Sequence, residues 1–161
     1  MEERLSDEYF MSLALEEARA AEALDEAPIG CVIVKGGQVI AKAHNMREHN
    51  KCATHHAEVL AIEEACRALG GWRLPGVTLY VTMEPCCMCA GAIVNARVER
   101  VVYGAPDLRF GAMGSLFDIT RFPLNHIPEC VGGVMRDECV SILSGYFKKK
   151  RKKDKTENET L

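Results

Sequence analysis

The 161-residue sequence predicts an α/β fold built on a layered sheet that starts with an antiparallel hairpin. β-Branched runs such as VTLYVT alternate along the chain with longer segments whose apolar residues follow helical spacing. In addition, Gly36-Gly37 separates two apolar runs, IGCVIVK and QVIAKAH, as in a two-residue hairpin turn. This length supports one sizeable core, so we expect a single domain over residues 1–150 and a basic, disordered tail over 151–161.

The first half of the chain has clear start and stop signals. A helix follows Ser6-Asp7-Glu8, where a capping hydroxyl precedes two acids, and the hairpin comes next. A second helix begins near His56 and ends at Gly70-Gly71, which supply the glycine that commonly ends helices. Residues 77–82 form a buried strand, and Pro85 marks the start of a third helix.

The second half is less regular. A short strand over residues 100–104 leads into a loop over residues 105–125 that is rich in Gly, Asp and Pro. Loops of that length in compact domains usually carry function. A weak strand over residues 130–134 precedes the last helix, which begins near Asp137 and runs into the basic tail.

Composition and charge limit the class of protein. Hydrophobic residues make up 48% and charged residues 27%, as in a globular protein. The start, MEERLSDEYF, lacks the basic and apolar regions of a secretory signal, and no apolar stretch is long enough to cross a bilayer, so we expect a cytoplasmic protein without membrane contact. The eight cysteines should then be mostly reduced thiols. The net charge is −3, but residues 148–153 read KKKRKK, which favours an anionic partner such as a nucleic acid.

The stretch MEPCCMCAG contains the chemistry-bearing cysteines. A CxxC pair at a helix N-terminus, here Cys86 and Cys89, suits redox chemistry and metal binding about equally. The segment THHAEV favours the metal, because His56 adds a nitrogen ligand and Glu58 a carboxylate at the start of the preceding helix. One His and two Cys make a tetrahedral zinc site with an open position, which indicates catalysis. Cys87 lies about 100° around the helix from Cys86, and we expect it to be a small buried filler.

Glu58 completes the pattern. A carboxylate that is close to the metal without binding it can transfer protons during the reaction. The combination of HxE, here His56-Ala57-Glu58, with PCxxC, here residues 85–89, is the known signature of zinc nucleobase deaminases.

The surrounding sequence narrows this class. VTMEPCCMCAGAIVNARVERVVYGAPD, GAMGSLFD and the ending ECVSILSGYFKKKR resemble the bacterial tRNA-specific adenosine deaminases of the zinc-dependent cytidine/deoxycytidylate deaminase superfamily. The resemblance extends from the first helix to about Lys150. It implies a three-layer α/β/α cytidine-deaminase-like fold, with a central mixed five-stranded sheet flanked by helices. It also implies one Zn²⁺ per subunit, a homodimer, and conversion of the wobble adenosine of an arginine tRNA to inosine, with the anticodon stem-loop as partner.

The same resemblance assigns roles to individual residues. His56, Cys86 and Cys89 would bind zinc, and Glu58 would move protons from water to the adenine ring and to the leaving ammonia. The matching positions for substrate binding are Asn45 and Ala57 for the nucleoside, Asp107 for the anticodon backbone, and Phe147, Lys148 and Lys150 for the anticodon loop. Residues 51–55, KCATH, depart from the Asp-Pro-Thr-Ala or Asp-Ala-Thr-Ala common in such enzymes. The resemblance therefore does not specify the details of the pocket wall, but this departure does not affect the expected metal site.

Two other functions fit the same residues. A deaminase of free guanine or cytosine could use this scaffold, and it would not need the basic tail. A non-catalytic zinc-binding module would close the site with a fourth ligand, Cys52 or Cys87, and would not need Glu58.

Overall fold

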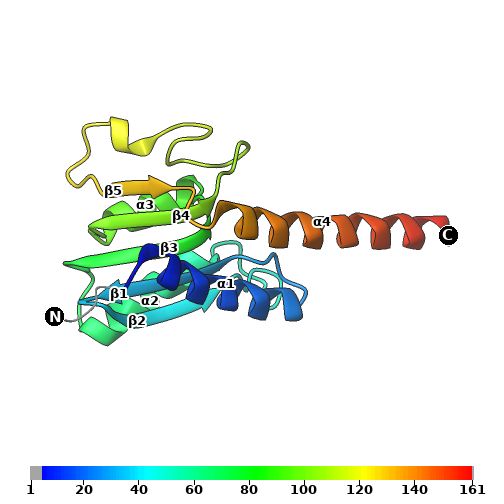
Figure 1. The fold of residues 1–161 in the computed structure, drawn as a ribbon, viewed down its shortest axis with the longest axis horizontal. Helices are drawn as coiled ribbons and strands as arrows, with labels where there is room; N and C mark the ends of the chain where they lie inside the picture. The colour runs from blue at the N-terminus through cyan, green and yellow to red at the C-terminus, as the bar shows by residue number, and fades with distance from the viewer. Residues whose placement is uncertain (1–4, 161) are drawn as a thin grey trace.

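A computed structural model describes residues 5–160, in which four helices surround a five-stranded sheet (Figure 1). In chain order the elements are α1 (Asp7–Ala23), β1 (Gly30–Lys35), β2 (Gln38–His44), α2 (Ala57–Leu69), β3 (Val77–Met83), α3 (Cys87–Asn95), β4 (Arg100–Ala105), the short 3₁₀ helix η1 (Ile119–Arg121), β5 (Glu129–Gly132) and α4 (Arg136–Glu159). Among these described residues, no helix combines the length and apolarity that a membrane span requires.

The sheet has the strand order β2-β1-β3-β4-β5. Strand β1 runs antiparallel to both β2 and β3, whereas β3, β4 and β5 are parallel to one another. The sheet is therefore mixed, and the expected five-stranded architecture with an initial hairpin is confirmed. Gly36 and Gly37 both have positive φ angles, +57° and +77°, as the tight two-residue turn between β1 and β2 requires.

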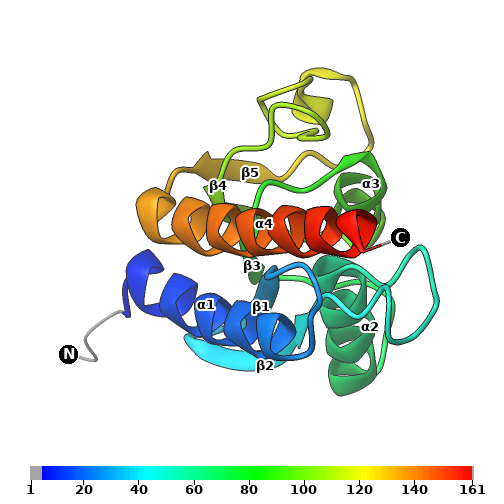
Figure 2. The same ribbon diagram turned by 90° about the vertical axis from the view of Figure 1, so that its right-hand side faces the viewer.

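Successive side chains along the strands point to opposite faces of the sheet, and each face has its own apolar core. Ile33 and Leu79 belong to the core beneath α2 and α3, whereas their neighbours Val32 and Tyr80 belong to the core beneath α1 and α4. Helices α1 and α4 lie side by side on that second face (Figures 1 and 2). The result is a three-layer α/β/α arrangement with apolar residues on both faces of the sheet.

This topology brings the starts of two helices to one edge of the sheet. The parallel strands β3 and β4 end at the same edge, and α3 begins directly after β3. Strand β2 also ends there, because it is antiparallel to β1 and β1 is antiparallel to β3. The segment that follows β2 leads into α2, so α2 and α3 both start at this edge, as expected from the sequence.

The structure departs from the expected boundaries in two places. Pro85 lies one residue before the N-cap of α3, which is Cys86, rather than inside the first turn. The second difference concerns residues 151–161, for which the sequence predicts disorder: α4 continues through Glu159 and projects away from the sheet (Figure 1). Lysine, arginine and glutamate are good helix formers, so this exposed segment has the intrinsic propensity to continue the helix.

Candidate active site

The N-caps of α2 and α3 are His56 and Cys86. N-cap side chains usually accept a hydrogen bond from the helix that they precede, and Ser6 does so for α1 by accepting from the Tyr9 N–H. Neither His56 nor Cys86 caps its own helix in this way, although both have extended backbone conformations. Their side chains are therefore free to turn across the gap between the two helices.

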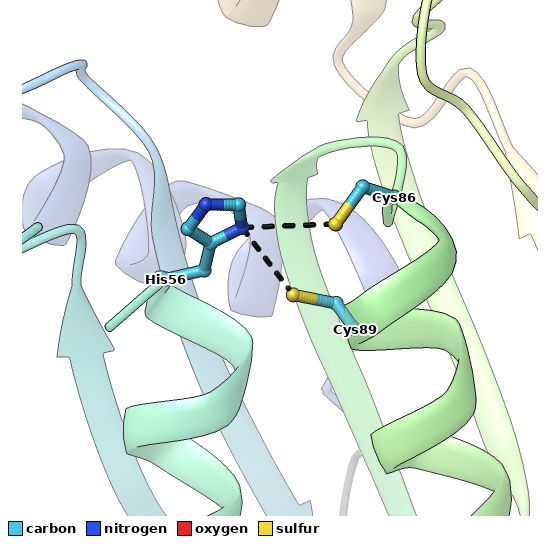
Figure 3. Close-up of side chains that lie close together, drawn as sticks. All are labelled: His56, Cys86 and Cys89. Atoms are coloured by element: carbon cyan, nitrogen blue, oxygen red, sulfur yellow. Dashed lines mark hydrogen bonds between the residues drawn. The ribbon is translucent and has the colours of Figure 1, made fainter. Parts of the chain in front are cut away.

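The two caps meet each other and Cys89 in that gap (Figure 3). The Nδ1 atom of His56 lies 3.7 Å from the Sγ atom of Cys86 and 3.6 Å from the Sγ atom of Cys89. All three potential ligand atoms lie within 4.8 Å of one another. The two sulfurs come from one end of α3 because CxxC spacing places them one turn apart. These three residues could hold a metal ion.

The site favours one thiolate over the other. Hydrogen bonds from Cys89 and His56 lower the pKa of the Cys86 thiol to about 4. The same bond, together with burial, raises the pKa of Cys89. The hydrogen bond with Cys86 raises the pKa of His56, although burial opposes it. Cys86 is therefore a thiolate at neutral pH, and the thiolate is the form of cysteine that binds a metal ion.

Glu58 lies in the first turn of α2, two residues after His56, and only 4% of its surface is exposed. Burial raises the pKa of its carboxyl group, and hydrogen bonds from its own N–H and from Cys89 partly offset the rise. A buried carboxyl group with a raised pKa is suited both to take up and to release a proton. Glu58 and His56 thus both lie at the N-terminal end of α2, where the sequence predicts that their side chains converge.

The remaining candidate ligands lie outside the group. Among residues 5–160 no fourth His, Cys, Asp or Glu joins His56, Cys86 and Cys89. The Cys52 thiol is 3.4 Å from the Thr54 hydroxyl, and His55 Nδ1 accepts a hydrogen bond from Asn50. The expectation that Cys87 is buried is wrong: the helix turns its side chain away from the site and into solvent.

The residues expected at the nucleoside lie at the same edge. Asn45 is buried directly after β2, where its N–H donates to Ile29 O and its Oδ1 accepts from the Arg47 N–H at 3.0 Å. Ala57 is fully buried as the first residue of α2, between His56 and Glu58. Both positions border the helix end that holds the potential metal ligand.

Asp107 lies in the long loop after β4, and its carboxylate is already engaged. It accepts hydrogen bonds from the backbone N–H groups of Arg109 and Phe110, at 3.0 and 3.2 Å. These bonds close a turn, so the structure gives Asp107 an internal role in shaping the loop.

The three expected contacts on α4 are not equivalent. Phe147 and Lys148 are exposed, and Phe147 packs edge-on against Tyr146. The Nζ atom of Lys150 lies 3.3 Å from the Asp25 carboxylate and 3.3 Å from the Tyr146 hydroxyl. Lys148 is thus open to an external anion, whereas Lys150 ties α4 to the α1–β1 connection.

Two buried carboxylates were missed by the sequence reasoning. Glu26 accepts hydrogen bonds from the N–H groups of Glu48 and His49 and from the His49 ring. Glu84 accepts from backbone N–H groups of the long loop. Each fixes one loop beside the site. Glu84 could have been found as the acid that follows a buried strand and precedes Pro85.

A mixed sheet with a His/Cys/Cys group between two helix N-termini, and a buried glutamate beside it, defines the class of nucleobase deaminases. Comparison with known proteins agrees, because a family model for MafB19-like deaminases matches residues 5–151. The tRNA-specific adenosine deaminase of Bacillus subtilis (strain 168) is 50% identical over 156 residues, which cover 96% of this chain and 97% of that protein.

Solved structures give the same result. A structure from a study of A-to-I editing by tRNA:A34 deaminases at the wobble position of transfer RNA has a TM-score of 0.82 and 47% identity, covering 84% of this chain and 99% of that one. A guanine deaminase from Nitrosomonas europaea has a TM-score of 0.74 and 26% identity, covering 88% and 84%. The chain belongs to the tRNA-specific adenosine deaminase family, within the deaminases that the MafB19-like model describes.

Proposed function

We propose that this protein hydrolyses the wobble adenosine of a tRNA anticodon loop to inosine and ammonia, with an arginine tRNA as substrate. One observation carries the chemistry: the buried Glu58 carboxyl lies beside a three-residue ligand group that has no fourth protein member among residues 5–160. The RNA substrate is supported by relatives of 45–50% identity that are tRNA-specific adenosine deaminases.

The ligand group fits Zn²⁺, one ion per subunit. With Zn–N distances of about 2.0–2.1 Å and Zn–S distances of about 2.3 Å, a tetrahedral zinc site separates nitrogen from sulfur by about 3.6 Å. The Nδ1 atom of His56 lies 3.7 and 3.6 Å from the sulfurs of Cys86 and Cys89. These side chains would hold zinc, and the bound ion would lower the pKa of a water molecule in the open position toward neutrality.

The remaining steps belong to the residues of the chain. Glu58 accepts a proton from the attacking water and delivers it to the adenine ring as the C6–O bond forms. It then takes the remaining proton from the C6 hydroxyl as the C6 carbonyl forms and delivers it to the amino group, so that the C6–N bond breaks and ammonia leaves. The raised pKa of Glu58, caused by burial, matches a group that must both take and give a proton.

Recognition is proposed to involve the loops and α4. The buried Asn45 is suited to hold the flipped nucleoside, and the exposed Phe147 and Lys148 are suited to contact the anticodon loop. Unpaired loop bases can be turned out and stacked on aromatic side chains, and lysines neutralise backbone phosphates. We further propose that the protein acts in the cytoplasm as a homodimer.

A direct assay tests this function. Purified protein is incubated with an unmodified arginine tRNA that carries an ACG anticodon, and inosine is detected by sequencing; guanine and cytosine are assayed in parallel for ammonia release. We expect inosine at the wobble position only. Glu58→Ala should abolish it, whereas Glu63→Ala, an exposed acid on the same helix, should not. Absence of inosine with the wild-type protein would refute the proposal, and release of ammonia from guanine alone would favour a free-base enzyme.

A further inference from the structure

The long loop after β4 is organised around a single buried side chain, Glu84. This residue follows β3, and only 3% of its surface is exposed. Its carboxylate accepts hydrogen bonds from the N–H groups of Asp107, Met113 and Ser115 at 3.3, 3.1 and 3.1 Å, and from the Ser115 hydroxyl. Hydrogen bonds to a charged acceptor are stronger than neutral ones, so residues 107–115 wrap tightly around this carboxylate.

The wrapped loop is joined to the metal-ligand end of α3. Gly111 forms an isolated β-bridge with Cys86, and the Ala112 N–H donates to Pro85 O at 2.9 Å. A Cβ atom at Gly111 would collide with a Glu84 carboxylate oxygen and with the Asp107 carbonyl, so the close approach depends on glycine. Residues 107–115 therefore keep a fixed position next to the ligand Cys86.

That position presents an aromatic ring to solvent. Phe110 immediately precedes Gly111 and is 66% exposed. Its N–H donates to the Asp107 carboxylate, which fixes the backbone of the turn that carries it. Phe110 is therefore an exposed aromatic ring on a backbone that is held next to the candidate active site.

We propose that Phe110 is a stacking surface for an unpaired base that flanks the target nucleotide, and that Glu84 positions it. The inference rests on the proposed RNA function. A base that neighbours the flipped nucleotide must lie at the rim of the site, and the β-bridge between Gly111 and Cys86 places the turn there. Aromatic rings bind such bases through their faces with little sequence preference, so Phe110 contributes to affinity for the RNA rather than to the chemical step.

Affinity and turnover of an anticodon stem-loop RNA test the proposal. Fluorescence anisotropy gives the Kd, and initial rates give KM and kcat. Phe110→Ala should raise Kd and KM about tenfold while kcat stays within twofold and zinc content is unchanged. Phe110→Trp should restore wild-type values. The control is Trp72→Ala, which removes a 56% exposed aromatic ring beyond the far end of α2 and should change nothing.

Glu84→Gln tests the positioning role. Glu84→Gln should raise Kd, as Phe110→Ala does. In the Glu84→Gln background, Phe110→Ala should raise Kd by a smaller factor than in the wild type, because the ring is already misplaced. If Glu84→Gln does not fold, Ser115→Ala, which removes one hydroxyl donor, should still raise Kd measurably. An unchanged Kd in Phe110→Ala would overturn the inference, as would a loss of subunit association in that variant. Failure of the proposed function is distinct, since it appears as absence of inosine with wild-type protein.

Discussion

The Nδ1 atom of His56 lies 3.7 Å from the Sγ atom of Cys86, although 30 positions separate the two residues. Each residue is the N-cap of a different helix, and neither caps its own helix. The sheet brings those two helix ends together, and Cys89 joins from the next turn of α3. The ligand group thus forms because β2 and β3 end at the same edge of the sheet.

The three neighbouring cysteines should differ sharply in metal binding. Cys86→Ala removes one of the proposed ligands and should reduce bound zinc from one ion per subunit to a small fraction, because two ligands hold zinc far more weakly than three. Cys87→Ala should keep zinc, since this side chain points into solvent. Metal analysis of the purified variants gives the stoichiometry. Equal zinc loss in both variants would contradict the assigned ligand set.

Replacing Glu58 should separate chemistry from binding. In Glu58→Gln the side chain keeps its size but cannot shuttle protons, so kcat should fall by about 10²–10⁴. Zinc content and the Kd for the RNA should remain close to wild type. Glu63→Gln, an exposed change on α2, provides the matched control. A variant that loses zinc in parallel with activity would indicate that Glu58 is a ligand.

Lys148 should contribute to RNA affinity through charge. It is exposed, and within residues 5–160 its side chain forms no hydrogen bond or ion pair. Lys148→Ala should weaken RNA binding and reduce the slope of log K against log salt concentration by about 1. Lys35→Ala, an exposed lysine at the opposite edge of the sheet, should leave the slope unchanged. Binding titrations between 50 and 200 mM salt, a range of about fourfold, measure the slope for each protein. Identical slopes for wild type and Lys148→Ala would exclude a phosphate contact there.

Glu26 should stabilise the fold in a pH-dependent way. Burial alone would raise the pKa of Glu26, but hydrogen bonds from His49 and Glu48 outweigh it and lower the pKa below the ordinary value of 4.5. A lowered pKa in the folded state stabilises the protein above the unfolded pKa, and the gain is lost as pH falls through the folded pKa.

The test is the free energy of unfolding of Glu26→Gln. At pH 7 the variant should be less stable than wild type by about 2 kcal/mol, because a charged acceptor is lost. The gap should narrow as the pH falls from 4.5 through the lowered folded-state pKa, where wild-type Glu26 also becomes neutral. Glu16→Gln, an exposed change on α1, controls for the general loss of an acid. Denaturant titrations at several pH values measure the gap, and a gap that stays constant down to pH 3 would rule out this role.

Local patterns in the sequence determined most of the helices and strands, apart from the last part of α4. The turn at Gly36-Gly37, the cap at Ser6 and the stop at Gly70 are short-range features, and each was placed correctly because its physical cause lies within a few residues. The pairing of HxE with PCxxC likewise predicted a site at His56, Cys86, Cys89 and Glu58, and the structure brings the three potential ligand atoms within 4.8 Å of one another.

Only the tertiary structure decided what depends on distant contacts. Glu26 and Glu84 look like ordinary acids along the chain, and their roles appear only where the loops fold around them. Cys87 is exposed because the packing of α3 determines which of its faces meets the core. Asp107 and Lys150, which the sequence predicts at the RNA, also contact Phe110 and Asp25 within the protein, and only the fold reveals these partners. Burial and hydrogen-bond partners are properties of packing, and the residue pattern along the chain does not specify them.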